Sequence, residues 1–370
     1  MDDESIALVV AASAFLLSGL VALAVFWGRE LPIDGRQSVG DFTAIASAIA
    51  AAAAFALAQA RPRRRNAARQ TAGHGERYRW FDLVALSLAH GVIALLGWIG
   101  IATVMEHSFL GATVYASPAA ALVAAATALS AFAAFLSGAN LSPRQLSLVL
   151  AVFLVVGMVT AMLSSADPLW WQMNLSALGI THDISALTFN LTLVVSGVLI
   201  TTIARFGTGS LPTGSVSQRR HRVTVRVLFV LLGAFLGCVG VFPVDRFFLM
   251  HNTVATGMTV VFAALALGLP WLIPSMPRVF VVLGFVYVWI IVALAALFAT
   301  GIYNLTAVEL VSAVLIFSWI ILFLRNVETN ARPGPAALSG DFFQRRADRL
   351  APETTHPVGA PGATVMGMRS

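Results

Sequence analysis

The side chains best suited to chemistry lie in two segments that separate long apolar runs. The first segment, Asp167–Asn190, contains His182 and Asp183, and the second contains Asp245 and His251. Imidazole nitrogens and carboxylate oxygens bind zinc in tetrahedral geometry. A zinc-bound water could then attack a lipid ester or amide, so these four residues are candidate metal ligands or acid–base groups.

Spacing argues against a metal. His182 and Asp183 are adjacent and would point in different directions on a helix. The sequence also contains no G-x-S-x-G, Walker A, H-E-x-x-H or C-x-x-C motif. We therefore predict no metal and no cofactor, and we assign no catalytic residue. We predict instead an Asp245–Arg246 ion pair, with His251 and Asn252 as hydrogen-bonding groups at a helix start.

Two further ionisable residues lie inside apolar runs. His90 is near the middle of one run, where a functional group or a neutral histidine bonded to a neighbouring helix would both fit. Glu309 is about one turn inside another run and could bind a proton or cation, or extend to the membrane interface. We favour the bonded histidine and the interfacial glutamate.

Composition shows what must position these residues. The chain has 370 residues, of which 58% are hydrophobic and 11% are charged. Soluble domains carry about 25% charged residues, so this chain has too little polar surface for a water-facing globule. A cytosolic enzyme, a coiled coil and a disordered chain are excluded, and the single Cys238 excludes a disulfide scaffold. The basic residues separate apolar runs instead of forming a polar face, so no nucleic-acid partner is expected.

Apolar runs long enough to span a membrane occur ten times. A spanning helix needs about 20 mostly apolar residues. The runs are Ser5–Trp27, Phe42–Ala60, Phe81–Met105, Ser117–Ser137, Gln145–Ser164, Ile184–Arg205, Thr224–Phe242, His251–Ile273, Arg278–Ala299 and Asn304–Leu324. The sequence therefore predicts an all-α polytopic transmembrane bundle, with membrane lipids as partners and an oligomeric state that we leave open.

Arginine placement predicts the orientation. All 23 basic residues are arginine, and a cytoplasmic N-terminus puts 20 of them inside, leaving Arg29, Arg36 and Arg246 outside. We predict that both termini are cytoplasmic and that the protein lies in the cell membrane. The basic run between the second and third spans could also contact anionic lipids, although topology alone explains it. Its first members are Arg61, Arg63, Arg64 and Arg65.

The spans differ in character. Ala44–Ala60 is rich in alanine, which favours close helix packing in the bundle interior. Val281–Phe298 and Val311–Leu324 are bulky, as is typical of lipid-facing helices. We predict a four-span region at 1–140, a six-span region at 141–325 and a disordered cytoplasmic tail at 326–370. A short helix at Ser339–Leu350 would fit within that tail.

Three motifs in the second half resemble the bacterial family called domain of unknown function 998. They are W-W-x-x-N-x-S-x-L-G at Trp170–Gly179, D-x-S-A-x-x-F-N at Asp183–Asn190 and F-P-x-D…H-N at Phe242–Asn252. The family looks like six helices, which would match Gln145–Leu324, and its layout is similar to the DRAM, FRAG and Sfk-type membrane proteins. The lysine-free, alanine- and arginine-rich composition is similar to that of high-GC actinobacteria.

The resemblance implies a set of site residues but no activity, because the bacterial family has none that is settled. Its eukaryotic look-alikes are associated with lipid remodelling and membrane organisation. The implied site residues are Trp170, Trp171, Asn174, Ser176, Gly179, Asp183, Asn190, Asp245, His251 and Asn252. They could equally hold the outer loops against the bundle. We therefore carry three hypotheses: a non-enzymatic protein with an outer-leaflet lipid or small-molecule site, a membrane-embedded lipid hydrolase or transferase, and a small-solute transporter.

Overall fold

The computed structural model describes residues 2–61, 80–180, 183–209, 211 and 213–331. Ten helices in these ranges are long and apolar enough to cross a membrane, which confirms the predicted number of spans. They are compatible with a multi-pass membrane protein. His182, Arg63, Arg64, Arg65 and the predicted short helix at 339–350 lie outside the described residues. The last helix continues to Ala331, so the described chain stays helical past the predicted start of the tail at Asn326.

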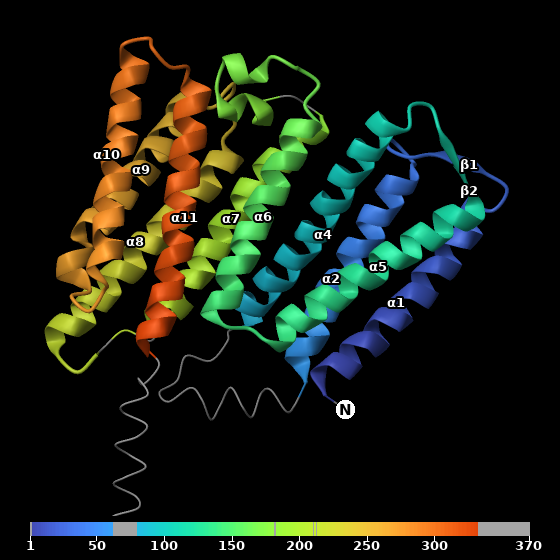
Figure 1. Ribbon diagram of the computed structural model, residues 1–370, viewed down its shortest axis with the longest axis horizontal. Helices are drawn as coiled ribbons and strands as arrows, with labels where there is room; N and C mark the ends of the chain where they lie inside the picture. The colour runs from blue at the N-terminus through green and yellow to red at the C-terminus, as the bar shows by residue number, and fades with distance from the viewer. Residues whose placement is uncertain (1, 62–79, 181–182, 210, 212, 332–370) are drawn as a thin grey trace, which may run out of the picture. The chain divides into compact units, whose positions relative to one another are not determined.

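The first half contains four spanning helices and two short strands. The helices are α1 (Asp3–Phe26), α2 (Val39–Ala60), α4 (Trp80–Ser108) and α5 (Ala116–Ala139). Strand β1 (Glu30–Pro32) pairs antiparallel with β2 (Thr113–Tyr115), with Leu31 opposite Val114. This pairing joins the α1–α2 connection to the α4–α5 connection, so both lie at the same end of the helices (Figure 1).

The second half contains six spanning helices and two 3₁₀ helices. The spanning helices are α6 (Pro143–Leu163), α7 (Ile184–Gly209), α8 (Val216–Val241), α9 (Phe248–Leu272), α10 (Arg278–Ala299) and α11 (Leu305–Ala331). The 3₁₀ helices η1 (Trp170–Gln172) and η2 (Leu175–Gly179) lie in the α6–α7 connection.

Helix starts follow local sequence signals. Ser38 and Ser142 accept hydrogen bonds from the backbone N–H groups three residues later, at 2.9 and 3.1 Å, and so cap α2 and α6. Ser215 and Gln218 form a reciprocal capping box at the start of α8. Asp2 caps α1 through Ser5, and this hydrogen bonding lowers the pKa of the Asp2 carboxyl group.

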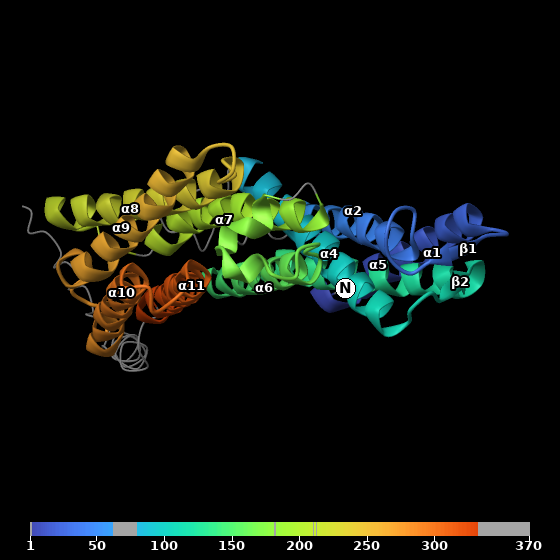
Figure 2. The same ribbon diagram turned by 90° about the horizontal axis from the view of Figure 1, so that it is seen from above.

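Small residues bring neighbouring helices close together. In the first half α5 packs on α1 and α2, and α2 also packs on α4 (Figure 2). A Cβ added at Gly91 of α4 would approach the carbonyl oxygen of Ala48 to 3.0 Å. The buried face of the alanine-rich α2 includes Ala44, Ala51 and Ala54. In the second half α7 packs on α6 and α8, while α4 contacts both α6 and α7 and so links the halves.

Of the two helices predicted to face lipid, one is mostly exposed and the other buries a face. Helix α10 is mostly exposed, as expected. Helix α11 instead buries Trp319 and Phe323, and Trp319 stacks on Phe280 with ring centroids 5.1 Å apart. On the same helix Leu310, Val311 and Val314 are exposed. The size of the side chains in this span did not predict which face of α11 is buried, because that depends on tertiary packing.

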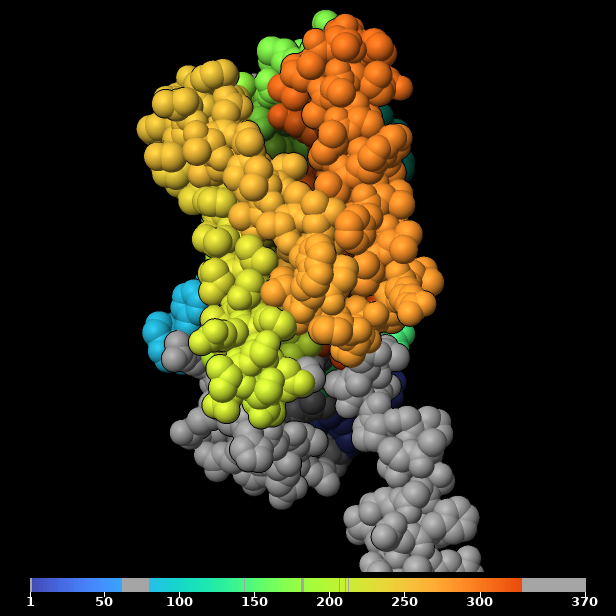
Figure 3. Space-filling view, turned by 90° about the vertical axis from the view of Figure 1, so that its left-hand side faces the viewer, coloured from blue at the N-terminus to red at the C-terminus, as the bar shows by residue number. Residues whose placement is uncertain are grey.

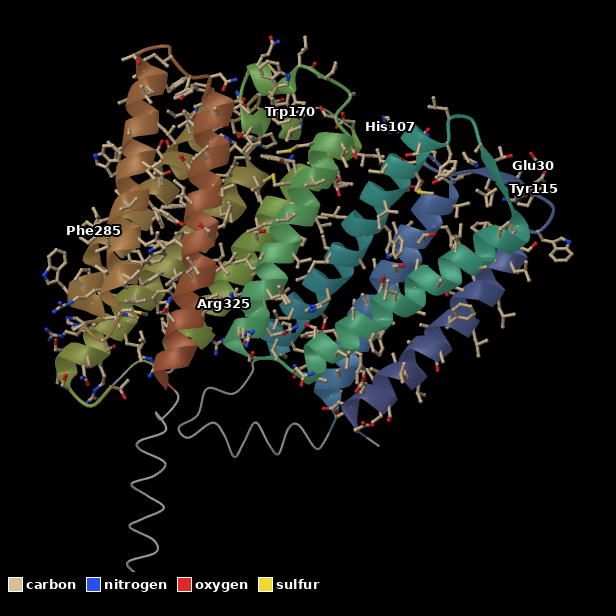
Figure 4. The ribbon with its side chains drawn as sticks, viewed as in Figure 1. Glu30, His107, Tyr115, Trp170, Phe285 and Arg325 are labelled. Atoms are coloured by element: carbon tan, nitrogen blue, oxygen red, sulfur yellow. The ribbon has the colours of Figure 1, made fainter. Side chains whose placement is uncertain are left out.

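The two ends of the bundle differ in chemistry. We call the end with β1, β2, η1 and η2 the hairpin face, and Figure 4 shows Glu30, His107 and Trp170 there. The opposite end, which we call the arginine face, carries Arg325 in the same view. Within the described ranges it also carries Arg61, Arg144, Arg205, Arg219, Arg220, Arg222, Arg226 and Arg278. Which side of the membrane each face occupies stays a prediction.

Candidate functional site

The α6–α7 connection is held against α11 by polar contacts at the hairpin face. The Glu309 carboxylate accepts the Leu175 backbone N–H at 2.6 Å, at the start of η2. Asn304, which caps α11, donates from its amide nitrogen to the Trp171 carbonyl oxygen at 3.1 Å. Glu309 therefore supports η2 instead of extending to the interface as we had favoured. Figure 3 shows part of this connection in green, between the start of α9 in gold and the α10–α11 end in orange.

His251 joins two of the motif segments. This side chain is only 4% exposed. Its Nδ1 lies 2.7 Å from the Phe242 carbonyl oxygen, which can only accept a hydrogen bond, so Nδ1 carries the proton. In the neutral ring Nε2 then accepts from the Ser176 hydroxyl at 3.0 Å. Both ring nitrogens are thus bonded to protein groups, and His251 is a positioning residue for η2 and the end of α8.

The start of α7 is also fixed by motif residues. The Asp183 carboxylate accepts the Ala186 backbone N–H at 3.0 Å and so caps the helix. Two turns later, Asn190 donates from its amide nitrogen to the Gly179 carbonyl oxygen at 3.1 Å. A Cβ added at Gly179 would approach the Asn190 side-chain oxygen to 2.6 Å, which explains the need for glycine at this position.

An open groove of about 780 Å³ lies between α7 and the α8–α9 connection. Three charged side chains line it: Asp183 from the start of α7, and Asp245 and Arg246 from the α8–α9 connection. The predicted Asp245–Arg246 ion pair is present, with Arg246 Nε 3.8 Å from Asp245 Oδ2 and both side chains accessible. Surface pairs of this kind contribute about 0–1 kcal/mol to stability.

The rest of the groove lining is mostly apolar. Ile184, Leu187, Leu191 and Val194 recur at helical spacing and form a stripe along α7. Leu187 is 65% exposed, so the stripe opens to the side of the helix and not into the bundle. None of these four residues was predicted from the sequence to belong to the site. Their spacing along α7 was the available signal, but every spanning helix has such a stripe.

The remaining candidate residues divide between two surroundings. Asp183, Asn190 and Asp245 line the groove, whereas Ser176 and His251 lie in the buried network beside it. Trp170 packs partly against the core, and Trp171 is 48% exposed. Asn252 donates to the Phe248 carbonyl within α9. Among the described residues, the buried side-chain oxygen of Asn174 has no hydrogen-bond partner. The structure therefore gathers part of the predicted set and gives the rest local or supporting roles.

The residues suggested for metal or acid–base chemistry do not form one cluster in the described part of the chain. There, no three His, Cys, Asp or Glu side chains are grouped closely enough to hold a metal ion. Asp183 and Asp245 line the groove, but His251 is not among its lining residues.

His90 takes part in a second buried network of the same kind. Its Nδ1 donates to the Leu86 carbonyl oxygen at 2.7 Å, and its Nε2 accepts from the Ser137 hydroxyl at 2.8 Å. The ring also stacks on Phe55, with centroids 4.3 Å apart. This matches the neutral, bonded histidine that we favoured from the sequence.

A buried ion pair links the halves near the arginine face. Arg205 of α7 contacts Asp82 of α4 at 3.0 Å, and the Asp82 side chain is 3% exposed. Burying these charges is costly unless they stay paired, so the contact fixes where α7 lies against α4. The sequence analysis did not identify this pair.

Comparison with known proteins leaves the chain without an assigned family. No family model matches the sequence, and neither a curated protein nor a solved structure shows significant similarity to it. The resemblance to domain of unknown function 998 therefore stays a prediction from the three motifs, and the function has to be argued from the groove.

Proposed function

We propose that this chain is a non-enzymatic integral membrane protein that holds one membrane lipid in the groove between α7 and the α8–α9 connection. The observation that carries the proposal is the order of chemistries along the groove. Charged side chains line its end at the hairpin face, and an apolar stripe continues from there along a spanning helix. A phospholipid presents a charged headgroup and an acyl chain in the same order.

The length of the apolar stripe supports a lipid over a water-soluble molecule. Ile184 and Val194 are ten residues apart, which is about 15 Å of helix at ~1.5 Å per residue. The hydrocarbon core of a bilayer is about 30 Å thick, so this stripe is as long as one leaflet. An acyl chain would lie along it without leaving the depth of its own leaflet.

The buried network beside the groove supports a binding role. The hydrogen bonds of this network are made to η2 and to the end of α8, by His251, Ser176 and Glu309. They hold the elements around the groove in place, and Asp183, Asp245 and Arg246 line the rim at which a headgroup would bind. The positive-inside tendency favours the arginine face as cytoplasmic. The headgroup site would then face the outside of a cell membrane, and the Arg61 region would face anionic lipids of the inner leaflet.

Lipid retention tests the proposal. The protein is purified in a mild detergent, and bound lipid is counted by native mass spectrometry for the parent, Leu187→Trp and Leu122→Trp. Leu187 lies in the groove, whereas Leu122 is a comparably exposed leucine on α5, at 58% against 65%. We expect about one lipid on the parent and on Leu122→Trp, and a loss from Leu187→Trp, because the indole would obstruct the apolar stripe on which the acyl chain lies.

Equal retention by both tryptophan variants would place the lipid elsewhere and overturn the proposal. Turnover of added lipid by the purified parent would contradict the non-enzymatic role and favour a hydrolase or transferase.

A further inference from the structure

We infer that the groove selects a phospholipid whose headgroup carries a primary ammonium next to its phosphate, as in phosphatidylethanolamine. This inference rests on the proposed lipid-binding function and adds the headgroup class. The juxtaposition that carries it is one guanidinium, Arg246, together with two carboxylates, Asp183 and Asp245, in the same groove lining.

The charges of the rim match a zwitterion better than an anion. Two carboxylates and one guanidinium leave a formal excess of one negative charge. A headgroup with a net negative charge would meet repulsion at such a rim. A headgroup with a phosphate and an ammonium can place each charge against an opposite one, the phosphate at Arg246 and the ammonium at the two aspartates.

Arg246 is suitably placed to receive the phosphate. Its side chain is 61% exposed, and its Nε lies 3.8 Å from Asp245 Oδ2. A guanidinium presents five N–H donors in a planar fork, so it can bind phosphate oxygens while staying beside a carboxylate. Arg246 also lines a second, smaller hollow with Phe248, Leu249 and Met250. The guanidinium thus stands where two apolar surfaces meet, as the phosphate of a two-chain lipid requires.

The two carboxylates can receive the ammonium from different elements. Asp183 is held in place because one of its oxygens accepts the Ala186 N–H at 3.0 Å and the other accepts the Ala166 N–H at 3.4 Å. Each carboxylate oxygen has two lone pairs, so it can also accept from a second donor. Asp245 comes from the α8–α9 connection, and its side chain is 34% exposed. A primary ammonium has three N–H donors, enough to bond both aspartates at once.

The groove lining distinguishes a primary ammonium from choline. A quaternary ammonium has no N–H donor, and proteins recognise it with the faces of aromatic rings. Phosphatidylcholine would therefore lose the hydrogen bonds that a primary ammonium can donate to the aspartates.

A competition experiment with matched acyl chains tests the inference. The full-length protein is exchanged into micelles that contain equal amounts of phosphatidylethanolamine, phosphatidylcholine and phosphatidylglycerol, and bound lipids are counted by native mass spectrometry. We expect phosphatidylethanolamine to be enriched about tenfold over phosphatidylcholine, which is the difference in affinity that one charge-assisted hydrogen bond can supply.

Rim variants connect the preference to the groove. Asp245→Asn should reduce the preference for ethanolamine over choline, and Arg246→Gln should weaken binding of all three lipids. Glu30→Gln and Arg29→Gln are matched controls, because both residues are exposed at the hairpin face on the other half of the bundle. These controls should bind like the parent, and the melting temperature of each variant shows that it is folded.

The outcomes separate the two proposals. Lipid retained through Leu187 but without a headgroup preference, or with a preference for choline or glycerol, would overturn this inference and leave the proposed function standing. An ethanolamine preference that persists in both rim variants would also overturn it. Failure to retain any lipid at the groove would overturn both.

Discussion

The two buried histidines use the same bonding pattern in different halves of the bundle. His251 and His90 each donate from Nδ1 to a backbone carbonyl and accept at Nε2 from a serine, Ser176 or Ser137. A neutral imidazole has one donor and one acceptor, so each ring is fully bonded. This removes the desolvation cost of placing a polar ring among apolar helices and fixes the tautomer of each ring.

Removing the serine partner of His251 should therefore destabilise the fold. In Ser176→Ala, Nε2 of His251 stays buried without a donor, which costs about 1–3 kcal/mol in the free energy of unfolding. Ser13→Ala is the control, because Ser13 is exposed and bonds only to the Val9 carbonyl of its own helix. Thermal unfolding in detergent measures both variants. Equal melting temperatures would contradict the role given to the Ser176–His251 bond.

Residue-level prediction succeeded where local sequence carries the signal. The Asp245–Arg246 pair could be predicted because its members are adjacent, and His90 because an unpartnered histidine is costly inside a membrane. The partners of His251 and Glu309 could not, because Ser176 lies 75 residues from His251 and Leu175 lies 134 residues from Glu309. Such pairs depend on how the helices are rotated and shifted against each other, which hydropathy does not encode.

Among the elements, α7 and α8 depend most clearly on the absence of side chains. Gly197 of α7 faces Gly233 of α8, and a Cβ added at Gly233 would lie 2.6 Å from the Gly197 carbonyl oxygen. Real Cβ atoms do not approach that closely, so the helices would have to separate. Gly237 is one turn along α8, where an added Cβ would meet only the Val194 carbonyl oxygen, at 3.9 Å.

These two glycines give a matched pair on one helix. Gly233→Ala should cost about 1–3 kcal/mol, because it forces the helix backbones apart. Gly237→Ala should be neutral or slightly stabilising, since alanine favours a helix by up to about 1 kcal/mol over glycine. The melting temperatures of the two variants in detergent give the comparison. A stable Gly233→Ala protein would contradict the close α7–α8 packing.

The elements themselves were predictable because a spanning helix has a strong signature in its own residues, namely length and hydropathy. All ten were predicted, and most ends differ by only a few residues. The exceptions are the start of α8, at Val216 instead of Thr224, and the end of α11, at Ala331 instead of Leu324, because hydropathy does not mark polar turns that extend a helix beyond the membrane. The face that each helix buries was harder to predict from the sequence. The aromatic residues of α11 are core, although the same composition in α10 is mostly exposed, because burial depends on neighbours that composition does not identify.

For the whole molecule, the separation of the arginine face from the hairpin face predicts an orientation. Single cysteines are introduced at Leu110, which is 85% exposed at the hairpin face, and at Ser217, which is exposed at the start of α8. Cys238 is first replaced by Ala, because it is the only native cysteine. A membrane-impermeant maleimide should label Leu110→Cys in intact cells and Ser217→Cys only after permeabilisation. The reverse labelling would contradict the predicted orientation.

Pairing of β1 with β2 has a consequence for how the chain is made. Thr113 and Glu30, which also share a side-chain hydrogen bond, are 83 residues apart. At a translation rate of about 5–20 residues per second, the ribosome needs roughly 4–17 seconds to reach the second strand after completing the first. During that interval α1 and α2 enter the membrane without their strand partner. The β1–β2 pairing can form only after α4 and β2 have been synthesised. The first half of the bundle therefore assembles late relative to the insertion of its first helix.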